Sequence, residues 1–225
     1  MRLALPKGEL FEPSLAVLER AGFDIRALKE ESRRMVFPPR RESDGLEYIV
    51  CRPSDVPVYV EYGAADLGIA GKDVLMEAGK NLFELADLGF GHCRFVLAAP
   101  EGDSRAAENY RHLGHLRVAT KYPKVTEEYF SRRGVQVEVI RLKGNVELAP
   151  LVGLAEAIVD LASTGRTLRE NNLQILEVIA ECTARLISNI ASQKLRFEEM
   201  NRLVRELREA AEICRNPSCP IRRQA

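Results

Sequence analysis

Short apolar runs alternate along the chain with longer segments in which apolar residues recur at helical spacing. A short continuous apolar run is typical of a buried strand, and recurrence about every 3.6 residues is typical of a helix. The pattern predicts strands at Arg2–Leu5, Glu47–Cys51, Leu67–Ala70, Arg94–Ala98, Leu116–Thr120, Gln136–Ile140 and Ala157–Ala162. It predicts helices at Phe11–Ala21, Val56–Tyr62, Val125–Arg132, Thr167–Glu181 and Lys194–Cys214. This alternation favours an α/β fold with largely parallel sheets.

A short internal similarity indicates two related units. Gly63–Ile69 and Gly153–Val159 share the pattern Gly-x-Ala, an acidic residue, two variable positions and a branched residue. Upstream, Arg2–Ala4 resembles Arg117–Ala119. Two similar units predict two lobes with a cleft between them, and chance similarity is the alternative. The first lobe is expected at residues 1–91 together with about 176–214, the second at 92–175, and a tail at 215–225.

The charge balance and the cysteines narrow the class of protein. Among 225 residues, 33 Lys and Arg balance 33 Asp and Glu, so the whole-chain charge does not call for nucleic acid or an anionic membrane. No apolar run approaches the roughly 20 residues that span a bilayer, and the first residues do not resemble a secretion signal. The five widely spaced cysteines make a poor disulfide framework or zinc site. We therefore expect a cytoplasmic protein with reduced thiols.

The segment from Ile158 to Leu168 carries the clearest candidate chemistry. A predicted strand containing Asp160 leads into a small, hydroxyl-rich loop with Gly165, and a predicted helix follows at once. Such a loop can direct backbone N–H groups and hydroxyl donors at an anion, while the carboxylate accepts hydrogen bonds from sugar hydroxyls. The loop therefore suits a ribose 5-phosphate. The alternative is a helix cap, because Thr167 and Glu170 have the spacing of a capping box.

The surroundings of this loop carry a family resemblance. Glu147–Leu168 resembles the signature of ATP phosphoribosyltransferases, which runs from a Glu through a Gly to an Asp and a Thr-Gly-x-Thr-Leu loop. The chain departs mildly at Asn145 and Glu156, where the family more often has Ser and Asp. Further similar segments are Leu3–Gly8, Arg52–Pro57, Gly63–Asp73, Cys93–Arg94 and Val118–Pro123, so that the resemblance extends to about Leu207.

The resemblance implies a fold, a reaction and partners. The fold is α/β, with two periplasmic-binding-protein-like (type II) lobes around a central cleft and C-terminal helices that pack back on the first lobe. The reaction transfers the phosphoribosyl group of phosphoribosyl pyrophosphate to N1 of ATP with release of pyrophosphate, as the first step of histidine biosynthesis. Mg²⁺ would act mainly through substrate phosphates. The chain resembles the short form of the family, a homodimer that joins a regulatory subunit similar to histidyl-tRNA synthetase in a hetero-octamer.

Candidate site residues follow from the matching positions. Residues expected to bind phosphoribosyl pyrophosphate are Glu147, Asp160, Ser163, Thr164, Gly165, Arg166 and Thr167. Residues expected to be catalytic, on the pyrophosphate and ATP side, are Arg52, Lys7 and Arg33. Residues expected near the nucleotide are Asp66, Gly71, Asp73, Thr120, Lys121 and Tyr122.

Lys7 and Arg52 each follow a predicted strand, and α/β proteins bind ligands at strand ends. A guanidinium in such a place can hold two phosphate oxygens at once. Glu147 could serve the ribose or the metal, or could be a helix-start carboxylate. Turn and cap roles are the alternative for Asp66, Gly71 and Asp73, and a solvated surface position is the alternative for Arg33.

Three other functions remain open at this stage. A non-catalytic two-lobed solute-binding or sensor protein would share the lobes but would not need the loop from Asp160 to Leu168. A nucleotide-salvage phosphoribosyltransferase would share the loop, but typically with two adjacent acidic residues before it, whereas Leu161 follows Asp160 here. An interaction protein that has lost its activity would not need the intact loop and Arg52.

Overall fold

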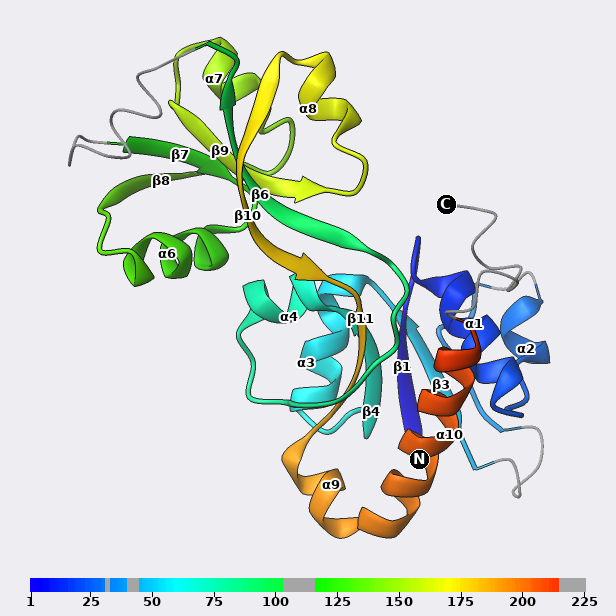
Figure 1. The fold of residues 1–225 in the computed structure, drawn as a ribbon. Coiled ribbons are helices and arrows are strands. Elements are labelled where there is room, and N and C mark those ends of the chain that lie inside the picture. The colour runs from blue at the N-terminus through cyan, green and yellow to red at the C-terminus, as the bar shows by residue number, and fades with distance from the viewer. Residues whose placement is uncertain (31–32, 40–44, 103–115, 215–225) are drawn as a thin grey trace. The chain divides into compact units, whose positions relative to one another are not determined.

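The computed structural model describes residues 1–30, 33–39, 45–102 and 116–214. The chain divides into two compact units (Figure 1), of which the first comprises Met1–Gly91 and the chain from Thr183 onward, and the second comprises His92–Cys182. Residues 215–225, which are expected to form a tail with Cys219, lie outside the described residues. Each unit is built on its own β-sheet.

The first unit is built on a six-stranded sheet in the order β2-β3-β1-β4-β11-β5. Its strands are β1 (Arg2–Pro6), β2 (Val36–Phe37), β3 (Glu47–Cys51), β4 (Leu67–Gly71), β5 (Phe83–Asp87) and β11 (Ala184–Ser188). Strand β1 is parallel to β3 and β4, whereas β11 is antiparallel to β4 and β5. The carboxyl ends of β1, β3 and β4 therefore meet at one edge of this sheet.

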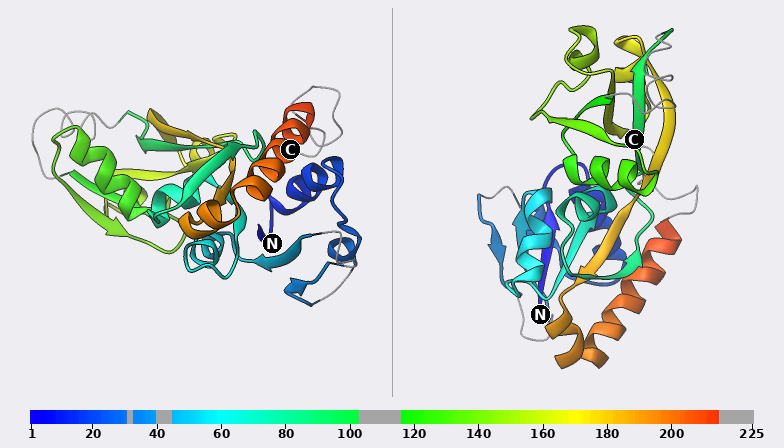
Figure 2. Two further views of the ribbon diagram at one scale, coloured as in Figure 1. Left: turned by 90° about the horizontal axis from the view of Figure 1, so that it is seen from below. Right: turned by 90° about the vertical axis from the view of Figure 1, so that its left-hand side faces the viewer.

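Helices cover both faces of this sheet. They are α1 (Phe11–Arg20), α2 (Arg26–Lys29), the 3₁₀ helix η2 (Pro53–Asp55), α3 (Val56–Glu61), α4 (Lys72–Ala78), α9 (Ile190–Leu195) and α10 (Phe197–Cys214). Because side chains alternate along a strand, Leu3 and Leu5 pack with α1 and α10, while Ala4 packs with α3. Figure 2 shows α10 and α3 on opposite sides of the sheet. None of the described helices is long and apolar enough to cross a membrane.

The second unit is built on a five-stranded sheet in the order β10-β6-β9-β7-β8. Its elements are β6 (Cys93–Pro100), β7 (Leu116–Thr120), α6 (Pro123–Arg132), β8 (Val137–Arg141), α7 (Leu148–Leu151), β9 (Ala157–Ala162), α8 (Arg166–Glu170) and β10 (Leu173–Cys182). Strand β7 is parallel to β8 and β9, so the carboxyl ends of these three strands share an edge. Leu168 of α8 and Ala149 of α7 pack with Ile158 of β9 in the core.

The predicted helix at Thr167–Glu181 is wrong. Helix α8 ends at Glu170, and Leu173–Cys182 forms strand β10, which pairs antiparallel with β6. Asn172 interrupts the helix with a φ of 54°, and buried and exposed positions then largely alternate along β10. Since β10 belongs to the second sheet, the chain returns to the first unit at Thr183 and not at about residue 176.

Other differences concern short elements. The predicted helix at Lys194–Cys214 is two helices, α9 and α10, which are separated at Arg196. Strands β2, β5 and β11 and helices α2, α4 and α7 were not predicted. Strand β11 completes the first sheet beside β4, so the return of the chain contributes a strand as well as helices.

The internal similarity has a structural counterpart in both units. The amide of Arg2 donates to Asp66 Oδ2 at 2.8 Å, and the amide of Asp66 donates to the Arg2 carbonyl at 3.0 Å. The amide of Arg117 donates to Glu156 Oε2 at 2.8 Å, and the amide of Glu156 donates to the Arg117 carbonyl at 3.1 Å. One acidic side chain thus fastens the start of the first parallel strand in each unit, and the repeat is confirmed.

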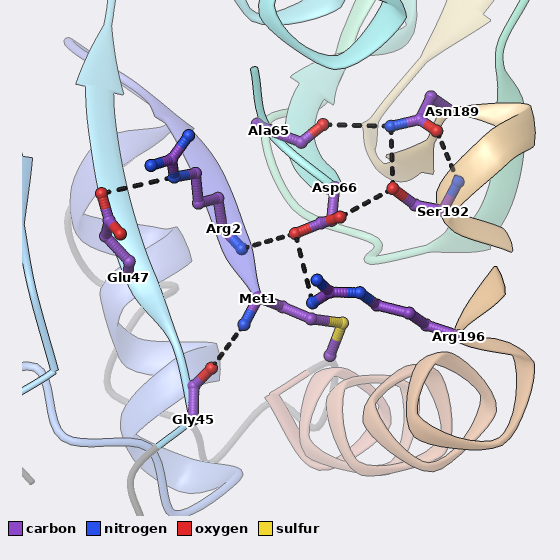
Figure 3. A network of polar contacts seen from close by, with 9 residues as sticks. All are labelled: Met1, Arg2, Gly45, Glu47, Ala65, Asp66, Asn189, Ser192 and Arg196. Atoms are coloured by element: carbon purple, nitrogen blue, oxygen red, sulfur yellow. Dashed lines mark hydrogen bonds and ion pairs between the residues drawn. The ribbon is translucent and has the colours of Figure 1, made fainter. Parts of the chain in front are cut away.

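The two carboxylates differ in what else they bind. Glu156 reaches the guanidinium of Arg117 itself at 2.5 Å. The shorter Asp66 accepts a hydrogen bond from the Ser192 hydroxyl at 2.7 Å and pairs with Arg196 at 3.8 Å (Figure 3). Asn189 strengthens this contact by donating to the carbonyl of Ala65 at 3.2 Å. Asp66 therefore joins the amino terminus of the chain to its returning C-terminal segment.

We expect Asp66→Asn to lower the free energy of unfolding by about 1–3 kcal/mol, because donors to a charged acceptor lose their partner. Burial alone would raise the pKa of Asp66, but Ser192, the Arg2 amide and Arg196 more than offset this and lower it from 3.8. The stabilisation is therefore present above this ordinary pKa and is lost as pH falls through the lowered one. Urea unfolding at neutral pH and at acidic pH measures both effects.

Glu19→Gln is the matched control for this substitution. Glu19 pairs with Lys29 at 2.8 Å, but both side chains are about half exposed, at 59% and 49%. Such surface pairs contribute about 0–1 kcal/mol. A loss in Asp66→Asn no larger than the loss in Glu19→Gln would contradict the proposed contribution of Asp66.

Candidate active site

The hydroxyl-rich loop of the second unit connects β9 to α8. Ser163, Thr164 and Thr167 are exposed, and Arg166 is exposed beside them. Gly165 has a φ of 68°, in the left-handed region, where a residue with a side chain is strained. An added Cβ would meet no atom closer than 3.7 Å, so the backbone conformation and not the available space favours glycine. The loop therefore presents three hydroxyl groups and a guanidinium to solvent.

The capping-box alternative for this loop is wrong. Helix α8 begins after Gly165, which places Thr167 inside the helix. The carboxylate of Glu170 accepts from Arg166 Nε at 2.7 Å, one helical turn away. The amide of Arg166 reaches Thr164 Oγ1 at 3.4 Å. The hydroxyl of Thr167 is thus not the cap of this helix.

Asp160 lies on β9 just before the loop and is 5% exposed. Its Oδ1 accepts from the amide of Leu161 at 2.8 Å, and its Oδ2 lies 3.4 Å from Lys121 Nζ. Burial raises the pKa of the Asp160 carboxyl, and the charge of Glu147 raises it further. The Leu161 amide and Lys121 act in the opposite direction. A buried carboxylate is thus held beside the loop by one amide and one cation.

Glu147 belongs to the same group of charges. It precedes α7, but its side chain makes no capping hydrogen bond with that helix. It is half-buried and acts on Asp160. The helix-start interpretation therefore lacks its expected contact, and the structure brings Glu147, Asp160 and the loop together in the second unit.

The turn after β7 meets β9 at this edge of the sheet. Thr120 is fully buried, and its hydroxyl donates to the Val159 carbonyl at 2.7 Å and accepts from the Tyr122 amide at 2.8 Å. The Tyr122 ring packs edge-on against Phe95 at 5.0 Å between centroids. Thr120 therefore fixes the turn with its hydroxyl, and its place on the nucleotide side stays a prediction. Lys121 is directed to Asp160.

In the first unit, Lys7 and Arg52 follow neighbouring strand ends. Pro6 of β1 is in register with Cys51 of β3, and the amide of Lys7 donates to the Cys51 carbonyl at 2.8 Å. Arg52 is exposed and precedes η2. Two cationic residues therefore lie side by side along the carboxyl edge of the first sheet.

Lys7 and Arg33 also line one pocket of about 710 Å³ within the first unit. Lys29 and Arg34 add two more cations, and Glu30 is the acidic residue of the lining. Phe11, Leu28 and Phe37 supply apolar wall. Sequence reasoning missed Lys29 and the apolar lining residues, because Phe11 has the spacing of a core residue, and Leu28 and Lys29 lie on α2, which was not predicted. A basic pocket with apolar walls suits an anion that carries a planar or apolar group.

Asp66, Gly71 and Asp73 do not share this placement. Asp66 lies beside Arg2, at the opposite edge of the first sheet from Lys7, and both of its oxygens accept hydrogen bonds within the first unit. Gly71 and Asp73 do lie at the carboxyl edge, after β4. A Cβ on Gly71 would come within 2.1 Å of Asp73 Oδ1, so the Asp73 carboxylate folds over Gly71 at the start of α4.

Burial raises the pKa of the Asp73 carboxyl, amide hydrogen bonds from its own helix start lower it, and Glu9 raises it. Gly71 is the N-cap of α4, and Asp73 accepts these amide hydrogen bonds within the first turn of the helix. Within the described residues, no three His, Cys, Asp or Glu side chains gather in a group that could hold a metal ion.

Cys51, Cys93 and Cys182 are not in disulfides. Burial, with Asp55, raises the pKa of the Cys51 thiol to about 11, which disfavours the reactive thiolate.

Comparisons with known proteins agree with this geometry. The family described as ATP phosphoribosyltransferase matches residues 52–209. An ATP phosphoribosyltransferase of Moorella thermoacetica is 50% identical over 215 residues, which cover 94% of this chain and 93% of that protein. The family match includes the loop between β9 and α8 and begins after β1, β2 and β3.

Two solved structures are similar to this chain to different degrees. The ATP phosphoribosyl transferase (HisG:HisZ) complex from Thermotoga maritima contains a chain with a TM-score of 0.78 and 35% identity, covering 94% of this chain and 98% of that one. The periplasmic aliphatic sulphonate binding protein SsuA from Escherichia coli, with a TM-score of 0.59 and 13% identity, covers 96% of this chain and 73% of that one and shares the fold alone. The chain belongs to the ATP phosphoribosyltransferase family.

Proposed function

We propose that this chain transfers the phosphoribosyl group of phosphoribosyl pyrophosphate to N1 of ATP, as the first step of histidine biosynthesis. The adenine N1 forms a bond to C1 of the ribose, and the bond from C1 to the pyrophosphate oxygen breaks. The electron pair of that bond leaves with the pyrophosphate. Such a reaction needs positioning and cationic stabilisation more than a nucleophilic side chain.

The loop after β9 carries this proposal. Asp160 accepts hydrogen bonds from the ribose hydroxyls, and Ser163, Thr164 and Thr167 donate to the 5-phosphate. Arg166 adds charge, and Gly165 gives the loop its shape. Supporting this assignment, Asp160 is held at the edge from which the exposed hydroxyls project. Glu147 serves the ribose side, beside Asp160.

The basic residues of the first unit serve the pyrophosphate and ATP. Lys7, Arg33 and Arg52 bind phosphate oxygens and stabilise the charge that the leaving group gains. Their support is the shared carboxyl edge of β1 and β3 and the pocket that Lys7 and Arg33 line. The apolar walls of this pocket accommodate the adenine ring. Gly71 and Asp73 lie at the same edge, on the nucleotide side.

Mg²⁺ would be held mainly by substrate phosphates and its own waters, so a dedicated protein cage is not required. It would supply positive charge that neutralises the leaving group. Lys7 and Arg52 would complement that charge.

We further propose that the chain acts as the short form of the family. Its homodimer joins a regulatory subunit similar to histidyl-tRNA synthetase in a hetero-octamer, in the cytoplasm. The support is the similarity to a chain of the HisG:HisZ complex along 98% of that chain.

The activity test mixes the purified chain with ATP, phosphoribosyl pyrophosphate and Mg²⁺, and follows adenine alkylation by ultraviolet absorbance together with pyrophosphate release. We expect both products, and we expect kcat/KM to fall about 100-fold or more in Asp160→Ala and in Arg52→Ala, because each removes a charged partner of the reacting groups. Arg132→Ala, which removes a 75% exposed guanidinium on α6, is the control. No product from folded wild-type chain, alone and with its regulatory partner, would favour the non-catalytic solute-binding function.

The loop conformation gives a second prediction. Gly165→Ala places a side chain at a left-handed residue, which costs about 1–2 kcal/mol, so we expect the KM for phosphoribosyl pyrophosphate to rise about tenfold. Gly134→Ala is the matched control, because Gly134 has a φ of 67° in the turn after α6. Similar losses of stability with a KM change only in Gly165→Ala would support the loop. Equal KM values in the two variants would contradict it.

The partner gives a third prediction. On size-exclusion chromatography the chain should elute with the regulatory subunit as one larger species, and the activity should rise and become sensitive to histidine. The chain alone should not respond to histidine. Separate elution at micromolar concentration, with unchanged activity, would contradict the short-form assignment.

A further inference from the structure

The Asp160 carboxylate occupies an unfavourable environment for a charge. It is 5% exposed and lies on the face of β9 that packs with apolar residues such as Ile158 and Leu168. Removing a carboxylate from water disfavours its ionised form. A carboxylate that must accept hydrogen bonds from sugar hydroxyls therefore needs a neighbouring group that favours its ionised form.

Lys121 supplies that contribution. Two charged side chains act on the Asp160 carboxylate, Lys121 from the turn after β7 and Glu147 from the start of α7. Glu147 disfavours the ionised form, whereas Lys121, with its Nζ 3.4 Å from Oδ2, favours it. Among the described residues, Lys121 is therefore the positively charged side chain that acts on the Asp160 carboxylate.

The backbone holds Lys121 and Asp160 in register. The buried hydroxyl of Thr120 donates to the Val159 carbonyl and accepts from the Tyr122 amide. Thr120 and Tyr122 flank Lys121 in the sequence, and Val159 directly precedes Asp160. The carbonyl of Thr120 also accepts from the Leu142 amide at 2.9 Å. The position of Lys121 relative to Asp160 is therefore fixed through the main chain, and its side chain is 34% exposed.

The internal repeat shows that the fold does not require this pair. Leu3 pairs with Leu67 in the first unit as Val118 pairs with Ala157 in the second. Counting on from these pairs, Pro6 corresponds to Lys121 and the fully buried Ala70 corresponds to Asp160. The same strand arrangement forms in the first unit with two apolar residues. The charged pair in the second unit is therefore an addition that packing alone does not explain.

We propose that Lys121 is a positioning residue of the phosphoribosyl site, which holds the Asp160 carboxylate ionised and oriented for the ribose hydroxyls, in place of the nucleotide contact expected from the sequence. The inference rests on the proposed function of Asp160. Lys121 acts through Asp160, so its removal should affect one substrate selectively. A nucleotide contact would instead affect ATP.

The test compares Lys121→Met, Lys121→Arg and the control Lys194→Met. Lys194 is an exposed residue of α9, which follows the end of β11 and so lies at the opposite edge of the first sheet from Lys7. Initial rates are measured with each substrate varied while the other is saturating. Calorimetry measures the binding of phosphoribosyl pyrophosphate with Mg²⁺, and thermal unfolding monitors the fold.

We expect Lys121→Met to raise the KM for phosphoribosyl pyrophosphate about tenfold, because the Asp160 carboxylate loses the cation that holds it in place for the ribose hydroxyls, and a tenfold change in binding corresponds to about 1.4 kcal/mol. The KM for ATP should stay within about twofold of wild type, Lys121→Arg should recover most of the loss, and Lys194→Met should behave as wild type. Weaker binding of phosphoribosyl pyrophosphate in calorimetry should accompany the KM change.

Three results would overturn the inference. A rise confined to the KM for ATP would make Lys121 a nucleotide contact, and unchanged KM values would leave it without a part in the site. Loss of cooperative unfolding in both Lys121 variants would make its role structural. Wild-type chain that neither binds phosphoribosyl pyrophosphate nor forms product would instead refute the proposed function, which the wild-type measurements detect separately.

Discussion

The parallel pairing of β7 with β9 is the interaction on which the candidate phosphoribosyl site depends. Parallel strands bring their carboxyl ends to the same edge of a sheet, and here those ends carry Lys121 and the segment from Asp160 into the loop. The register of the pair is secured at its start by the reciprocal bonds of Arg117 with Glu156, and near its end by the Thr120 hydroxyl on Val159. A shift by one residue would turn Asp160 to the other face of the sheet and separate it from Lys121.

The first unit repeats the clamp at the start of its strands but places different chemistry at their ends. Arg2 and Asp66 hold β1 beside β4, yet the following strand ends lead to Lys7 and, through β3, to Arg52. The two units thus share a frame while one offers a carboxylate with hydroxyl donors and the other offers cations. In the proposed function, the carboxylate and hydroxyl donors would recognise the ribose phosphate and the cations would stabilise the departing pyrophosphate.

The first unit has Asp66 at the position where the second unit has the longer Glu156, and this difference affects how the C-terminal segment is attached. Glu156 reaches the guanidinium of its own partner, Arg117, whereas Asp66 binds Ser192 and Arg196 of the returning segment. Strand β11 and helix α10 are thereby attached to the first unit, where Met200 and Leu207 complete its core. The C-terminal segment is accordingly part of the first unit's fold.

The sequence by itself determined the α/β class, most strand positions, the repeat, the loop and the family, because each rests on local periodicity or on a contiguous motif. It could not determine that Leu173–Cys182 is a strand, since the apolar residues there satisfy helical spacing as well and only pairing with β6 decides between the two. For the same reason the boundary at Thr183 depended on tertiary structure.

The partners of individual polar residues were also beyond the sequence. The sequence does not show that Asp66 binds Ser192, far along the chain, or that the Thr120 hydroxyl donates to the Val159 carbonyl. Lys121 likewise gains its relation to Asp160 only when β7 and β9 lie side by side. Local residue order specifies which groups are present, whereas the pairing of distant strands decides which of them meet, because hydrogen bonds and ion pairs act only over a few ångströms.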